Sequence, residues 1–176
     1  MPIDFRATWE QADPFSRFLA RVTKLQSLWE SGARNAKVPD WAREKFAALP
    51  NGLRMLVLNA DWCLDSASAV PILACLAEVV PGVELKVLDR DSHPEIMDQY
   101  LTDGTRSIPL AILLDRDFKV LGRWGPRPVE LQDFVRRSLE RMSKDSIHLE
   151  IRKWYVADRG NAMLREIHEA ITVMPQ

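Results

Sequence analysis

Residues 53–66 read LRMLVLNADWCLDS, and this stretch decides the fold class. It opens with the apolar run 53–58, which has the length of a buried strand and lacks helical periodicity. A turn over 59–62 follows, and apolar residues then recur at helical spacing from position 69 to position 77. The stretch therefore predicts a buried strand that leads directly into a helix, with Cys63 at the junction.

The flanking sequence predicts further strands in the middle of the chain and helices at both ends. The helix after Cys63 contains Pro71, which is expected to kink it. The segments 53–58 and 83–88 are joined by a helix, so they should pair as parallel strands. A hairpin formed by 109–114 and 120–124 should add antiparallel strands to the same sheet. The remaining expected elements are helices over 13–31 (ending in a loop at 31–32), 40–49, 93–101, 129–142 and 147–173 (with a break near Gly160), a strand over 83–88, and hairpin strands over 109–114 and 120–124.

This order predicts an α/β fold with a mixed central sheet of about four strands flanked by helices. The chain has 176 residues, the size of one domain with a large core. Its 24 Lys and Arg against 25 Asp and Glu give a net charge of −1, which argues against nucleic acid and anionic membranes as partners. There is no membrane-spanning apolar run, and Asp4, Arg6 and Glu10 stand where a signal peptide needs apolar residues, so a cytoplasmic location is predicted.

The chain has two cysteines, and they differ in expected role. Cys63 faces the N-terminus of a helix, where free backbone N–H groups favour the thiolate, and the Ser66 hydroxyl can point back at the sulfur. Asp65 would disfavour the thiolate if it pointed inward. Cys75 lies 12 residues further along the same helix, about 18 Å away, which exceeds the ~7 Å limit for a disulfide. Cys75 is therefore expected to be a small buried apolar residue.

Two motifs carry a family resemblance. Residues Trp62-Cys63-Leu64-Asp65-Ser66 resemble the W-C-x-x-C active-site turn of the thioredoxin family, and Arg106-Ser107-Ile108-Pro109 resembles the loop in which that family places a cis-proline facing the redox cysteine. Together with 97–101 and 124–128, they resemble a bacterial thioredoxin-like subfamily with a monothiol turn and helical extensions.

The resemblance implies a thioredoxin-like fold and a division of the chain. Residues 53–142 would form the thioredoxin core, with a helical extension over 1–52 and another over 143–176, all in one domain over 1–176. It also implies site residues in two groups. The catalytic residues would be Cys63, Ser66 and Pro109, and the substrate-binding residues would be Trp62, Asp65, Arg106 and Ile108.

Two departures from the family pattern limit the chemistry. Ser66 stands where the family has its second, resolving cysteine, so one chain cannot complete a dithiol reaction. Val57 stands six residues before the nucleophile, where thioredoxins carry a buried acid that helps deprotonate the resolving thiol.

The leading functional prediction is therefore an enzyme, a monothiol thiol-disulfide oxidoreductase. Its Cys63 forms a mixed disulfide with a cysteine-containing protein or a low-molecular-weight thiol, and an external thiol resolves it. The alternative is a non-catalytic thioredoxin-like adaptor or a thiol redox sensor. No cofactor is expected, and no metal either, because the three histidines and two cysteines lack ligand spacing. The pattern specifies no oligomeric state.

Overall fold

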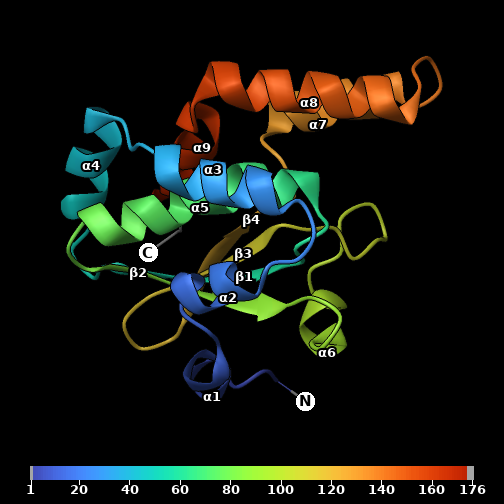
Figure 1. Ribbon diagram of the computed structural model, residues 1–176. Coiled ribbons are helices and arrows are strands. Elements are labelled where there is room, and N and C mark those ends of the chain that lie inside the picture. Colours follow the sequence, from blue (N-terminus) through green and yellow to red (C-terminus); the bar gives the residue numbers. More distant parts are fainter. Residues whose placement is uncertain (1, 174–176) are drawn as a thin grey trace.

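The structure is a computed structural model that describes residues 2–173 (Figure 1). Its helices are α1 (Phe5–Gln11), α2 (Phe15–Arg21), α3 (Gln26–Asn35), α4 (Asp40–Ala47), α5 (Leu64–Val79), α6 (Pro94–Met97), α7 (Val129–Ser138), α8 (Lys144–Asp158) and α9 (Asn161–Thr172). Its strands are β1 (Leu53–Asn59), β2 (Val83–Asp89), β3 (Leu110–Leu114) and β4 (Val120–Trp124). The segment expected to extend to residue 176 lies outside the described residues from 174 onward.

The four strands form one mixed sheet in the order β2-β1-β3-β4. β1 pairs parallel with β2 and antiparallel with β3, which pairs antiparallel with β4. The predicted α/β class and mixed sheet are therefore confirmed. Leu58 lies opposite Leu110, so the residues that follow β1 and those that precede β3 meet at the same end of the sheet. This pairing brings the Cys63 turn close to Pro109.

Strand β1 is buried on both faces, as its apolar sequence predicts. Met55 and Val57 face the larger apolar cluster, to which α3, α5, α8 and α9 contribute. Leu56 and Leu58 face a smaller cluster with residues from α1 and α6. Figure 1 shows these two groups of helices on opposite sides of the sheet.

The helix expected over 13–31 is two helices, and the single-helix prediction is wrong. The backbone N–H groups of Thr23 and Lys24 donate to the Asp61 carboxylate, each at 3.0 Å, instead of continuing the helix. Leu25 then adopts a left-handed conformation (φ 49°) and α3 begins. A contact from 38 residues away in sequence thus outweighs the local helical pattern.

The loop expected at 31–32 is also absent, because α3 continues to Asn35. Gly32 lets α3 approach α5 closely, since a Cβ there would lie 3.1 Å from Pro71 Cγ and 3.3 Å from the Ala67 carbonyl oxygen. Helix α5 contains Pro71 without being divided by it.

Helix α1 was not expected from the sequence. Asp4 caps it by accepting the Ala7 backbone N–H at 3.0 Å, and Phe5 and Trp9, four residues apart, are buried. The break predicted near Gly160 does separate α8 from α9, and Gly160 has a positive φ of 82°. Across residues 2–173, no helix combines the length and the apolar character needed to cross a membrane.

Candidate active site

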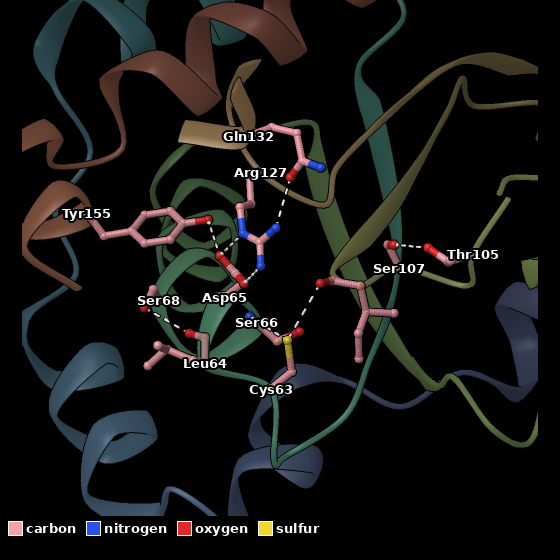
Figure 2. A network of polar contacts seen from close by, with 11 residues as sticks. Cys63, Leu64, Asp65, Ser66, Ser68, Thr105, Ser107, Arg127, Gln132 and Tyr155 are labelled. Carbon is pink, nitrogen blue, oxygen red and sulfur yellow. Dashed lines mark hydrogen bonds and ion pairs between the residues drawn. The ribbon is translucent and has the colours of Figure 1, made fainter. Parts of the chain in front are cut away.

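Cys63 is the N-cap residue of α5, directly after the turn that follows β1. Its backbone is extended (φ −85°, ψ 117°), and its Sγ accepts the backbone N–H of Ser66 at 3.4 Å. The sulfur thus takes the place of the usual serine or aspartate oxygen at a helix N-terminus. Figure 2 shows this contact at the first turn of the helix.

The same sulfur faces the segment before β3. Cys63 Sγ lies 3.5 Å from the Ile108 carbonyl oxygen, so the thiol donates its proton to that carbonyl. The Ile108–Pro109 peptide bond is cis. The structure therefore brings together four residues that the sequence singled out separately, namely Cys63, Ser66, Ile108 and Pro109.

The Cys63 side chain is buried, with 8% of the residue exposed. Burial raises the pKa of the thiol, the Ser66 side chain and backbone N–H lower it in part, and the negative charge of Asp65 raises it further. The pKa of Cys63 is thus raised, although the helix N-terminus was expected to lower it. Removal of the sulfur from water outweighs the helix amides.

Ser66 contacts the sulfur through its backbone N–H, and its side chain also lowers the pKa of the thiol, as the sequence had suggested. The residue is fully buried, and its Oγ has no hydrogen-bond partner among the residues that the structure describes. The position expected to hold a resolving thiol in the family therefore carries an unpaired buried hydroxyl.

Asp65 points away from solvent into a network of polar side chains. Its carboxylate accepts two hydrogen bonds from Arg127, from Nε at 2.8 Å and from Nη2 at 2.7 Å, and one from the Tyr155 hydroxyl at 3.4 Å. Arg127 also donates to the Gln132 side-chain oxygen at 2.9 Å. Figure 2 shows Arg127 between Asp65 and Gln132, with Tyr155 on the other side of the carboxylate.

Burial raises the pKa of Asp65, and the charge of Arg127 offsets part of that rise. The Asp65 side chain is only 6% exposed and is fully engaged by Arg127, so the prediction that it contacts substrate does not fit its position. It acts instead within the protein, where its charge is close enough to influence Cys63.

The sequence reasoning missed Arg127 and Tyr155 as parts of this site. Arg127 belongs to the 125–128 turn, which packs so closely on the backbone of Pro109 that a side chain at Gly125 would collide with it. Tyr155 lies on α8, and no sequence motif includes it. The sequence offered one clue to Arg127, since an aspartate that is buried in the Cys63 turn needs a cationic partner.

Trp62 and Arg106 lie at the exposed rim of the site. Trp62 is 50% exposed, and the Arg90 guanidinium stands over its ring, 5.1 Å from the centroid. Arg106 pairs with Asp98 at 2.7 Å, and both side chains are about half exposed. Exposed ion pairs of this kind are weak, so the pair with Asp98 could be exchanged for a contact with substrate. Arg106 therefore stays a predicted substrate-binding residue.

Cys75 lies apart from this site. Both cysteines are free, and the Cys75 thiol donates to the Ala36 carbonyl at 3.6 Å. Within residues 2–173, no group of three or more His, Cys, Asp or Glu side chains is arranged to hold a metal ion.

Comparison with known proteins agrees with the fold. The sequence profile of the family described as Thioredoxin matches residues 12–144. The thioredoxin of Chlamydia trachomatis is 34% identical over 73 residues, which span 41% of this chain and 69% of that protein. The thioredoxin of Chlamydia muridarum is 33% identical over the same coverage.

Two solved structures resemble the whole chain. A protein of unknown function from Pseudomonas aeruginosa superposes with a TM-score of 0.76 at 19% identity, covering 97% of this chain and 98% of that one. An HIV epitope-scaffold superposes with the same TM-score at 18% identity, covering 98% and 100%. These two share the fold. Fold, site and family profile together place the chain in the thioredoxin family.

Proposed function

We propose that the protein is a monothiol thiol-disulfide oxidoreductase whose nucleophile is Cys63. The Cys63 thiolate attacks one sulfur of a disulfide, an S–S bond forms to Cys63, and the other sulfur leaves as a thiolate. An external thiolate then attacks the partner's sulfur in this mixed disulfide, and Cys63 leaves as a thiolate. One disulfide is consumed and one is formed, so the protein is unchanged.

One observation carries the proposal, namely the position of Cys63 Sγ between the Ser66 N–H and the Ile108 carbonyl. The helix N-terminus offers a donor to the developing thiolate. The carbonyl before Pro109 offers an acceptor to an extended backbone that approaches the sulfur. An extended segment paired with that carbonyl would lie beside the nucleophile.

The Ile108 carbonyl also explains how a thiol with a raised pKa can react. In the free protein this carbonyl accepts the Cys63 thiol proton, which stabilises the protonated form. A backbone N–H of an incoming extended segment would compete for the same oxygen. Docking thus removes one interaction that keeps the sulfur protonated, so extended peptide disulfides should react faster than small ones.

External resolution follows from the rest of the chain. Ser66 has no thiol, and Cys75 lies 12 positions along the same continuous helix, about 18 Å from Cys63 at the helical rise. The second thiol must therefore come from a cysteine-containing protein or a low-molecular-weight thiol.

Intact-mass analysis tests the proposal. The folded Cys75→Ser variant is incubated with glutathione disulfide or with a disulfide-linked extended peptide at pH 8. We expect one adduct, its removal by reduced glutathione, and faster reaction with the peptide. The Cys63→Ser/Cys75→Ser double variant is the control and should form none. A folded protein that forms no adduct with either disulfide would overturn the proposal.

A second candidate, a non-catalytic adaptor or a thiol redox sensor, is favoured by the 8% exposure and raised pKa of Cys63. An adaptor needs no reactive sulfur. Under this alternative, Cys63→Ser would leave partner binding unchanged, and Cys63 would react with disulfides only after unfolding. A sensor would react once with an oxidant but would not turn over with excess disulfide and thiol.

A further inference from the structure

A cavity lies on the side of α5 that faces away from the sheet, between α3, α5 and α8. It encloses about 570 Å³, which is within the range of small-molecule sites. Figure 1 shows α3 and α8 running along α5, with α8 above them. None of the residues assigned to the active site by the sequence lines this cavity.

The wall of the cavity combines small apolar residues with polar side chains such as Ser31 and Ser68. Ala67 and Pro71 of α5 are buried beneath it, and Gly32 of α3 brings the two helices close together. Leu28 and Val156 add apolar surface from α3 and α8. Val156 is 76% exposed, so apolar side-chain surface faces the solvent at the mouth.

The rim of the cavity is cationic. Lys37, Arg152 and Arg159 line it, and no aspartate or glutamate does. None of the three forms an ion pair within residues 2–173. By contrast, the arginines of the Cys63 side of the molecule, such as Arg106 and Arg127, are paired with carboxylates. Three unpaired cations around an apolar hollow are complementary to an anion with an apolar body.

We propose that this cavity binds a small amphiphilic anion, such as a medium-chain carboxylate, with its apolar body against Ala67 and Pro71 and its charge at Arg152 and Arg159. The volume suits a molecule of this size, and the hollow is lined by residues of three helices, α3, α5 and α8. The proposal does not depend on the reactivity of Cys63, which does not line the cavity, although Tyr155, which donates to Asp65, does.

Fluorescence titration with 8-anilinonaphthalene-1-sulfonate, an anion with an aromatic body, tests the site, and decanoate serves as the competitor. Arg152→Gln/Arg159→Gln should weaken the affinity of both at least about ten-fold, because charge-assisted contacts are lost. Arg137→Gln/Arg141→Gln removes the same charge from exposed, unpaired arginines outside the cavity and should change affinity less than about two-fold.

A second variant pair keeps the test independent of the arginines. Val156→Glu places a negative charge at the mouth and should abolish binding, whereas Leu139→Glu, at another exposed apolar residue, should not. Circular dichroism checks that each variant is folded. Equal binding by all variants, no displacement of the dye by decanoate, or binding only to phosphatidylglycerol vesicles would overturn the proposal.

Discussion

The Cys63 sulfur is subject to opposing influences that can be measured one at a time. Burial raises its pKa, the Ser66 side chain and N–H lower it, and the Asp65 charge raises it. The direction of the net shift in the Cys63 pKa decides how fast the free protein reacts, because only the thiolate is a nucleophile. A raised pKa means that Cys63 is a slow nucleophile at neutral pH until a partner docks.

The first prediction concerns the pH dependence of alkylation. In the Cys75→Ser background, the rate of reaction with iodoacetamide should rise with a midpoint above about 8.5, the value of a free cysteine. Below that midpoint Cys63 is protonated and unreactive, so at pH 7 its rate should fall below that of the denatured chain. The denatured protein is the control and should titrate near the free value. A native midpoint below it would contradict the assignment of burial as the dominant cause.

Asp65 gives a second prediction with two readouts. Asp65→Asn removes the negative charge that raises the pKa of Cys63, so the alkylation midpoint should fall. The same change leaves the partly buried Arg127 without its carboxylate, which should lower the free energy of unfolding by about 3 kcal/mol.

A double variant separates the cost of an unpaired Arg127 from the contribution of the ion pair itself. Asp65→Leu combined with Arg127→Met replaces the ion pair by apolar side chains and should be more stable than Asp65→Asn in urea unfolding. If Asp65→Asn is as stable as the natural protein, the ion pair contributes nothing to the fold.

At the residue scale, the sequence identifies the residues at the centre of the site but not the distant residues that contact them. Cys63, Ile108 and Pro109 are recognisable because each belongs to a short motif. Arg127 and Tyr155 reach Asp65 from 62 and 90 residues away, and no local pattern encodes such a contact.

Among the elements, the connection between α2 and α3 depends on one carboxylate. Asp61 accepts the backbone N–H groups of Thr23 and Lys24, and the Thr23 hydroxyl at 3.2 Å. Burial alone would raise the pKa of Asp61, but these hydrogen bonds outweigh it and lower the pKa overall. The Cys63 turn thereby holds the N-terminal helices in place.

The third prediction follows from this lowered pKa. Asp61→Ala should reduce the free energy of unfolding at pH 7 by about 1–2 kcal/mol, because charge-assisted hydrogen bonds are lost. The contribution is complete above the unfolded pKa of about 3.9 and is lost as the pH falls through the lower folded value. The natural protein and Asp61→Ala should therefore converge in stability at acidic pH. Asp117→Ala, at an exposed turn, is the control and should show no such convergence.

The first turn of α5 gives a fourth prediction. Ser66→Cys in the Cys75→Ser background places a thiol one helical turn from Cys63, whose sulfur already lies 3.4 Å from the residue-66 nitrogen. Oxidation with glutathione disulfide should then close an internal disulfide, so thiol titration should find two free thiols before oxidation and none after it. Persistence of the glutathione adduct would show that the turn cannot bring the two sulfurs together. Turnover should be slow, because Val57 supplies no proton acceptor.

Element prediction from sequence succeeded where the pattern is local. The strands β2 and β4 and the break at Gly160 follow from alternation and from a glycine. The division of the segment 13–31 could not be foreseen, because Asp61 is distant in the sequence. The continuation of α3 through Gly32 depends on close packing against Pro71, which also involves a distant segment.

At the scale of the whole molecule, the C-terminal helices are part of the core. Trp124 of β4 donates to the Glu166 carboxylate of α9 at 2.7 Å, and Glu166 also accepts the Val129 backbone N–H at 2.8 Å. Ile151, Leu164 and Ile167 are buried against the same apolar cluster as β1. We propose that residues 1–176 form one cooperative domain, in which 143–176 is not a separable extension.

The fifth prediction tests this unity. The full chain should unfold in a single transition in urea, monitored both by tryptophan fluorescence and by circular dichroism. A chain that ends at residue 142 loses the buried side chains of α8 and α9 and should lack a cooperative transition. A truncated chain that unfolds cooperatively, with the stability of the full chain, would show that the core forms without α8 and α9.

The contact of Asp65 with Arg127 and Tyr155 also imposes an order on synthesis. The ribosome makes the chain from its N-terminus, so Asp65 emerges 62 residues before Arg127 and 90 residues before Tyr155. An aspartate cannot be buried as a charge until its cationic partner is present. The contacts of Asp65 are therefore completed only after Arg127, and then Tyr155 of α8, have left the ribosome, so an unfinished chain presents Cys63 in a different environment from that of the completed protein.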